Sequence, residues 1–373
     1  MKHLLLSLAA CVLLPGCEGG FASPSRIDSL RVLAVKTRVY DAAAAEFSET
    51  ASGHAGARVR LELFGVDGAA LAGSARPLQT AWFSGCHNPP TRQFYACYPL
   101  LNAVASAIDP ELVSERNANA PRELFSATAE ADLSVTSEAA GTALEFTLPE
   151  NILSAAPRSD RDTVHFGVSF VFFAVCAGLL EARPELRNQI PVACVDPTTR
   201  KDVGPKNFVS GFVAVYSYDD GVVNQNPRLS RLTLGGVDVD APCASDADCE
   251  LPSEAPEGLS RRCTEAGRCI LKVPRCVQNE CPKFLIEPKL AAESAEILPG
   301  GDNEVIWANF YASAGALGVH AELLNERSLG LTKEPGSYFT PPKAALSSAD
   351  LWLTVDDQRG GTDYHHFSVE VGE

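Results

Sequence analysis

Short stretches of alternating apolar and polar residues recur along most of the chain. The alternation is clearest in Arg58–Leu63, where Val59, Leu61 and Leu63 alternate with charged residues. Because successive side chains of a β-strand point to opposite faces, this pattern predicts a strand with one buried face. Comparable stretches, separated by Gly, Pro, Asp and Asn, are Leu30–Val35, Val59–Val66, Thr80–Ser84, Ala143–Leu148, Val164–Cys176 and Phe208–Tyr218. The pattern therefore predicts an all-β fold.

These stretches place a first domain at residues 26–237. Val164–Cys176 is apolar on both faces, which predicts a central strand that is covered on both sides. Two short helices, Leu100–Ala107 and Pro121–Ala127, are expected in an insertion. The order of strands, with Trp82 on the third, resembles an immunoglobulin-like β-sandwich with enlarged loops. The resemblance implies that the third and sixth strands are antiparallel neighbours.

A second, smaller sandwich is expected at residues 283–373. Its candidate strands are Glu304–Tyr311, Val319–Leu324, Ser337–Thr340, Ala349–Val355 and Tyr364–Val371. The segment Leu351–Thr362 and the closing strand resemble the last hairpin of PKD- or cadherin-like β-sandwiches. We expect Asp356 to bond to the turn backbone, with Gly360 or Gly361 at positive φ.

The N-terminus carries an export signal. Leu4–Leu14 is an apolar run of about eleven residues, too short for the roughly 20 that span a bilayer as a helix. Together with Lys2 it predicts a signal peptide at residues 1–16. Leu14–Cys17 resembles the lipobox of bacterial lipoproteins, which implies an acylated Cys17 and a tether at 17–25. The alternative is ordinary signal cleavage beside an incidental cysteine.

Ten cysteines remain after Cys11, which is removed, and Cys17 are set aside. An even number in an exported chain predicts disulfides. Cys86 and Cys176 lie at opposite ends of neighbouring strands in the expected sandwich, too far apart to bond. The favoured pairs are therefore Cys86–Cys97 and Cys176–Cys194.

The other six cysteines define a disulfide-rich module at residues 238–282, between the two sandwiches. They are Cys243, Cys249, Cys263, Cys269, Cys276 and Cys281. Their connectivity does not follow from the sequence. Zinc is the competing interpretation, but the spacing contains no C-x₂-C pair and no histidine is nearby. The segment resembles small extracellular C-x-S-D-x-D-C modules, in which Asp246 and Asp248 either bind Ca²⁺ or cap a constrained loop.

Charge and motifs exclude several functions. The 47 acidic residues against 31 basic ones give a net charge of −16, which disfavours nucleic acid as a partner. The sequence contains no G-x-S-x-G, Walker A, G-x-G-x-x-G or H-E-x-x-H motif. His365 and His366 are adjacent on a strand, so they point to opposite faces and are not expected to share a metal. We therefore predict no catalytic residue, no metal site and no cofactor.

The whole layout resembles uncharacterised lipoproteins of myxobacteria and related Gram-negative bacteria. The resemblance implies a protein held in the envelope by its acyl chains, and Glu18 after the lipidated cysteine favours the outer membrane. We expect a non-enzymatic binding, adhesion or scaffold module for an envelope protein or polysaccharide. The alternatives are a structural subunit of an envelope or secretion assembly and an enzyme with a site assembled from distant residues. Candidate binding residues in the stapled loops are Phe94, Tyr95 and Tyr98.

Overall fold

The computed structural model describes residues 23–76, 78–107, 126–131, 143–158, 164–219, 221–239, 241–278 and 280–372. Strands make up 49% of the chain and helices 9%, which confirms the predicted all-β fold. The predicted signal peptide, Cys17 and most of the predicted tether lie outside the described residues.

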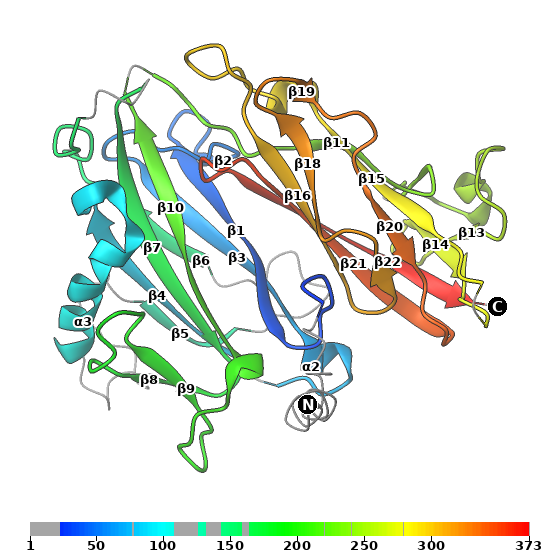
Figure 1. The fold of residues 1–373 in the computed structure, drawn as a ribbon, viewed down its shortest axis with the longest axis horizontal. Coiled ribbons are helices and arrows are strands. Elements are labelled where there is room, and N and C mark those ends of the chain that lie inside the picture. The colour runs from blue at the N-terminus through cyan, green and yellow to red at the C-terminus, as the bar shows by residue number, and fades with distance from the viewer. Residues whose placement is uncertain are drawn as a thin grey trace, which may run out of the picture.

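The first sandwich consists of two four-stranded sheets (Figure 1). One sheet has the order β2 (Glu46–Ser48), β1 (Leu30–Asp41), β3 (Arg58–Asp67), β6 (Ala143–Thr147). The other has the order β10 (Phe208–Tyr218), β7 (Phe166–Cys176), β4 (Leu78–His87), β5 (Ser126–Ala131). This strand order resembles that of an immunoglobulin-like sandwich, with β2 as an additional edge strand beside β1. The expected antiparallel pairing of the two strands that carry Cys86 and Cys176 is present, between β4 and β7.

Alternation explains why the two sheets pack face to face. Val59, Leu61 and Leu63 of β3 are fully buried in the core between the sheets. From the opposite sheet, Trp82 of β4 packs edge-on against Phe173 of β7, with 5.8 Å between ring centroids. Buried aromatic and β-branched residues of this kind stabilise a sandwich core mainly through the apolar area that they remove from water.

Strand β7 is covered on both faces, as its sequence predicts. It lies between β10 and β4, and all of its residues from Gly167 to Cys176 are buried. The face away from the first core packs under α3 (Tyr98–Ala107) and the hairpin of β8 (Leu179–Ala182) and β9 (Val192–Val195) (Figure 1). The disulfide Cys176–Cys194 attaches this hairpin to the end of β7.

The second sandwich also has two sheets and encloses its own core. The smaller sheet has the order β12 (Val237–Asp238), β11 (Leu229–Leu234), β15 (Phe284–Leu290), β20 (Ser337–Thr340), β17 (Ala316–Leu317). The larger has the order β13 (Ser260–Cys263), β14 (Cys269–Pro274), β22 (Thr362–Gly372), β21 (Leu346–Asp356), β16 (Ile306–Ala312), β18 (Ala321–Glu326), β19 (Gly330–Leu331).

The strand pairing does not follow the domain boundaries that the sequence predicts. β11 precedes residue 238, yet it pairs with β15 in the second sandwich. β14 comes from the cysteine-rich segment, yet it pairs in parallel with β22 and places Leu271 and Val273 in the second core. The cysteine-rich segment is therefore built onto the second sandwich, because its residues Leu259, Leu271 and Val273 are buried in that core.

The predicted helices have different outcomes. Leu100–Ala107 lies within α3. Pro121–Ala127 falls mostly outside the described residues, and its last two residues begin strand β5, not a helix. The other helical elements in the described parts of the chain are single turns: α2 (Gly68–Leu71), η1 (Pro90–Arg92), η2 (Phe94–Cys97), η4 (Pro205–Asn207), η5 (Asp246–Cys249) and η6 (Ala292–Ser294).

The two sandwiches meet along β1, β3 and the β21–β22 hairpin. Trp352 of β21 is 1% exposed and packs in a small apolar cluster with Leu33 and Val66 of the first sandwich. Beside it, Phe64 of β3 stacks on Tyr364 of β22, with 4.7 Å between ring centroids. The junction therefore buries aromatic side chains from both sandwiches.

Candidate functional site

The disulfide Cys86–Cys97 holds the predicted binding loop against the first sandwich. It joins the end of β4 to η2, with 5.8 Å between the Cα atoms. Phe94, at the start of η2, stacks on Phe212 of β10, with 4.1 Å between ring centroids and an interplanar angle of 18°. The loop is thus packed on the outer face of the sheet that contains β10.

The three predicted binding residues differ in their surroundings. Tyr98 packs against Phe94 and Phe172, and burial raises the pKa of its hydroxyl. Tyr95 is 54% exposed. Phe212, 41% exposed, was missed by the sequence argument, although alternation along β10 places it on the same face as Phe208 and Tyr216. We call Phe94, Tyr95 and Phe212 the aromatic surface.

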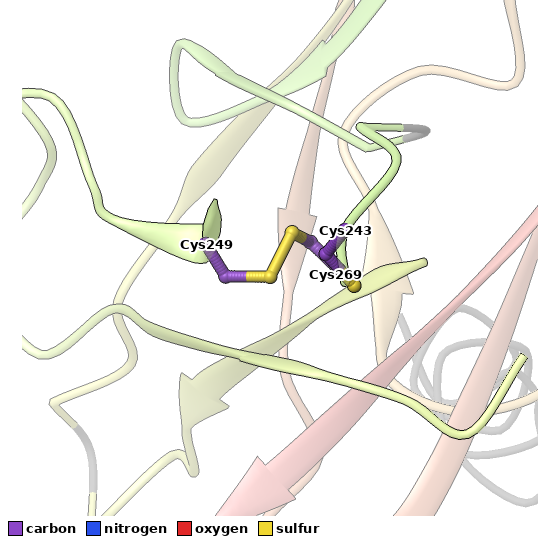
Figure 2. A group of neighbouring side chains, drawn as sticks. All are labelled: Cys243, Cys249 and Cys269. Carbon is purple, nitrogen blue, oxygen red and sulfur yellow. A yellow bond between two sulfur atoms is a disulfide. The ribbon is translucent and has the colours of Figure 1, made fainter. Parts of the chain in front are cut away.

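Two disulfides lie side by side in the cysteine-rich segment. Figure 2 shows Cys249 bonded to Cys269, with Cys243 next to them, and the three sulfur atoms lie within 4.8 Å of one another. Cys243 is itself bonded to Cys263. Zinc binds thiolates, so this sulfur cluster offers no ligand while both disulfides are intact. The last predicted cysteines, Cys276 and Cys281, form a fifth disulfide.

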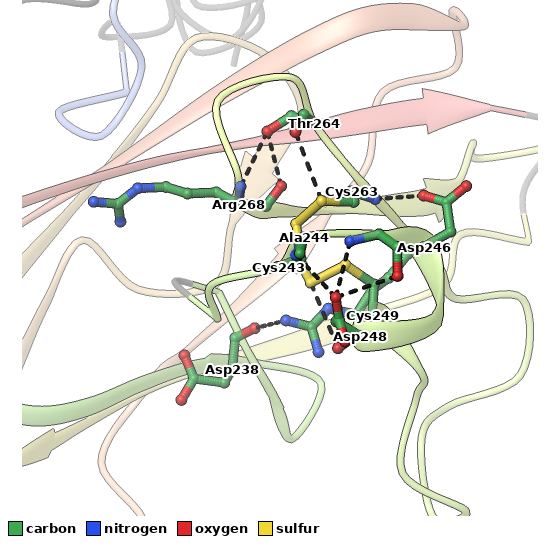
Figure 3. The surroundings of a disulfide bond; sticks show 12 residues. Asp238, Cys243, Ala244, Asp246, Asp248, Cys249, Cys263, Thr264 and Arg268 are labelled. Atoms are coloured by element: carbon green, nitrogen blue, oxygen red, sulfur yellow. Dashed lines mark hydrogen bonds between the residues drawn. A yellow bond between two sulfur atoms is a disulfide. The ribbon is translucent and has the colours of Figure 1, made fainter.

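Asp246 and Asp248 organise the loop between these disulfides (Figure 3). The carboxylate of Asp248 accepts hydrogen bonds from the backbone N–H groups of Ala244 and Ser245, both at 2.8 Å, and these bonds lower its pKa. Asp246 accepts from the N–H of Cys263 at 2.7 Å. Of the two interpretations of these residues, loop capping matches the contacts.

The adjacent histidines, His365 and His366, contact two different acids. His365 Nε2 lies 3.1 Å from Asp363 Oδ2, and His366 Nε2 lies 3.1 Å from Asp350 Oδ1. The imidazole of His366 also stacks on Trp352, with 5.4 Å between ring centroids.

One side-chain cluster has the residue types of a hydrolase triad. It consists of Ser368, Asp350 and His366. Ser368 Oγ donates to Asp350 Oδ1 at 2.6 Å. Burial acts to raise the pKa of Asp350, but the hydrogen bonds from His366 and Ser368 hold it below its ordinary value. In a triad the histidine stands between serine and aspartate and removes the serine proton. Here the aspartate stands in the middle, so the histidine is not placed to activate the serine.

A buried polar cluster lies where the β21–β22 turn meets the first sandwich. Asp357 is 1% exposed and accepts hydrogen bonds from the backbone N–H groups of Arg359 and Gly361 and from Asn224 Nδ2. Burial raises its pKa to about 6. The sequence assigned the turn to Asp356, but that carboxylate bonds to the side chains of Thr354, Thr362 and Asn309. Asp357 therefore accepts the hydrogen bonds from the turn backbone, and Gly360 has the predicted positive φ, at 94°.

Arg359 neutralises the acids of this cluster. Its guanidinium bonds to Glu304 at 2.5 Å and to Glu296 at 2.6 Å, and burial raises the pKa of Glu304. These ion pairs join the turn to the segment between β15 and β16 of the second sandwich.

Comparison with known proteins identifies no family for the chain. No protein-family model matches it, and neither does any curated protein. Among the described residues, no helix is both long enough and apolar enough to cross a membrane.

Proposed function

We propose that the chain is a lipid-anchored protein of the bacterial cell envelope that binds another envelope component and catalyses no reaction. The apolar run and Cys17 support the anchor. The disulfide pairing of all ten described cysteines supports export, because disulfides persist in oxidising compartments. The acyl chains of Cys17 hold the protein at the membrane, in the outer membrane of a Gram-negative cell.

The aromatic surface is the observation that carries the binding role. Tyr95 and Phe212 are large aromatic residues that remain about half exposed, and Phe94 joins them through its stack on Phe212. The Cys86–Cys97 disulfide fixes their loop before any partner arrives, which lowers the entropy lost on binding. Rigid aromatic side chains of this kind are favoured at the centres of protein interfaces.

Site-specific photo-crosslinking in intact cells tests this role. A photoreactive phenylalanine analogue replaces Tyr95 in one variant and Tyr338 in the other. Tyr338 is the matched control because it is 52% exposed but lies on β20 of the second sandwich. We expect a discrete crosslinked adduct from position 95 and none from position 338. Equal crosslinking from both positions, or none from position 95, contradicts the proposed surface.

A further inference from the structure

Strand β10 has an unpaired edge over half of its length. It pairs with β7 along all eleven residues, but no described strand pairs with its other side. The carbonyl of Tyr216 accepts from Gly53 N–H at 3.0 Å, so this carbonyl points away from β7. Because backbone direction alternates along an antiparallel pair, the N–H and C=O groups of Ser210 and Phe212 also point away from β7.

The free part of this edge is residues 208–213. Towards the C-terminal end of β10, Gly53 bonds to Tyr216, and Gly360 lies so near that a Cβ there would be 2.6 Å from the carbonyl oxygen of Ala214. The outward backbone groups of Ser210 and Phe212 have no hydrogen-bond partner within the described parts of the chain. An edge of this kind is a template for another strand.

Several other described sheet edges carry the usual protection against such pairing. β2, β12, β17 and β19 have only two or three residues each. β13 has four residues and includes Arg261 and Arg262. Natural proteins protect edges by short strands and by charge. Residues Phe208–Tyr218 have neither protection, because β10 is eleven residues long and contains no charged side chain.

The core of the first sandwich is also incompletely covered along this edge. Val209 and Val213 of β10 are partly buried at the rim of the core, as are Val32 and Val35 of β1. β1 runs beside β10 (Figure 1), and β2 covers it only at Val39–Asp41. A rim of valines from both sheets therefore borders the free edge.

We propose that residues 208–213 of β10 accept an extended, uncharged segment of another polypeptide with alternating apolar residues. This inference rests on the proposed binding function and names its site and its class of partner. The segment's backbone pairs with the outward groups of Ser210 and Phe212. Its side chains on one face cover the valine rim, and those on the other lie beside Phe212 and Phe94.

The rim favours a flexible segment over a folded second copy of this chain. In a second copy, the β10 valines already line that copy's own core, so they are not available to cover this one. A flexible segment with alternating side chains can pair with the edge and fill the rim at once.

Residue-resolved hydrogen exchange on the full-length protein in detergent tests the free edge. We expect the amides of Ser210 and Phe212 to exchange at least tenfold faster than those of Gly211 and Val213, which face β7. A fluorescein-labelled decapeptide of alternating valine and threonine should slow the two fast amides. Equal protection of all four amides without peptide, or no slowing with peptide, contradicts the proposal.

Binding of the same decapeptide, measured by fluorescence anisotropy, tests the backbone pairing. Ser210→Pro removes one outward N–H and leaves the β7 ladder intact, so we expect affinity to fall at least tenfold. Ser210→Ala keeps that N–H and should bind within twofold of the wild type. A decapeptide with alternate backbone amides methylated should not bind, and this control needs no protein variant.

Three results overturn the inference: equal affinity of Ser210→Pro and Ser210→Ala, full binding of the methylated decapeptide, or a peptide-free dimer that Ser210→Pro dissociates. The last would assign the edge to a second copy. A failure of this inference can be distinguished from a failure of the proposed lipid anchor, because acylation of Cys17 is measured independently of peptide binding.

Discussion

Asn226 joins both sandwiches through a single side chain. Its Nδ2 donates to the carbonyl of Thr37 at 2.7 Å, and its Oδ1 accepts from the N–H of Thr362 at 2.9 Å. Nearby, the buried ammonium of Lys36 on β1 pairs with Asp363 of β22 at 2.9 Å and with Glu49 at 2.7 Å. Removing one partner of such a buried set leaves the other without compensation, so these contacts make the relative position of the sandwiches specific.

Asp363→Asn should destabilise the protein at neutral pH. Burial opposes ionisation of Asp363, but His365 and Lys36 lower its pKa to about 2. A lowered pKa stabilises the folded state above the unfolded pKa near 4, and this stability is lost as the pH falls through the folded pKa. We expect a loss of about 1–2 kcal/mol at pH 7, measured by urea unfolding. The difference from wild type should shrink below pH 4.

Asp302→Asn is the matched control for Asp363→Asn. Asp302 pairs with Arg327 at 3.4 Å, but both side chains are more than half exposed. Its loss should therefore cost less than about 0.5 kcal/mol at any pH. An equal effect of the two substitutions at pH 7, or a gap that widens with acid, contradicts the role assigned to Asp363.

Most long strands could be predicted from the sequence, but β15, β11 and β14 were not, and neither were the short strands and most pairings. All eleven strand stretches that the sequence predicts coincide with strands of the structure, and Phe208–Tyr218 and Ser337–Thr340 match at both ends. Strands such as β12 and β19 have two residues, too few for any alternation to be visible. β11 and β14 were not assigned to the second sandwich because their partners, β15 and β22, are distant in sequence.

Some features of the candidate site could likewise be predicted from the sequence, and others could not. The two local disulfides of the first sandwich follow from strand order, since Cys86 and Cys176 lie at opposite ends of paired strands. Phe212 was missed because its partner Phe94 is brought to it by folding and not by sequence proximity. The cluster around Asp357 depends on Asn224, which is 133 residues away.

The turn between β21 and β22 provides a test at the level of one element. Gly360 has φ +94°, and an added Cβ would collide with Ala214 of the first sandwich. Gly301 has a similar φ of +91° and open space around it. Gly301→Ala should cost about 1 kcal/mol from backbone strain alone. Gly360→Ala should cost about 1–3 kcal/mol more, because the turn must also move off β10.

Urea unfolding of the two glycine variants measures this difference. Equal destabilisation by the two substitutions would show that the turn does not need its close contact with β10. In that case the sandwiches would not be held together in the way that the Asp357 cluster indicates.

At the scale of the whole molecule, the features combine into a stapled pair of sandwiches with an acidic surface. The net charge of −16 keeps the body away from anionic headgroups, so the proposed attachment depends on the acyl chains of Cys17. The aromatic surface and the free edge of β10 both lie on the first sandwich, and the buried junction packs this sandwich against the second. A rigid body on a lipid anchor is suited to presenting a binding surface within the envelope.

Metabolic labelling with a palmitate analogue tests the central claim most directly. The wild-type protein should be labelled and should fractionate with membranes. Cys17→Ala should lose both properties, whereas Cys11→Ala, within the removed signal peptide, should keep both. A Cys17→Ala protein that remains labelled would contradict the proposal of a lipid-anchored envelope protein.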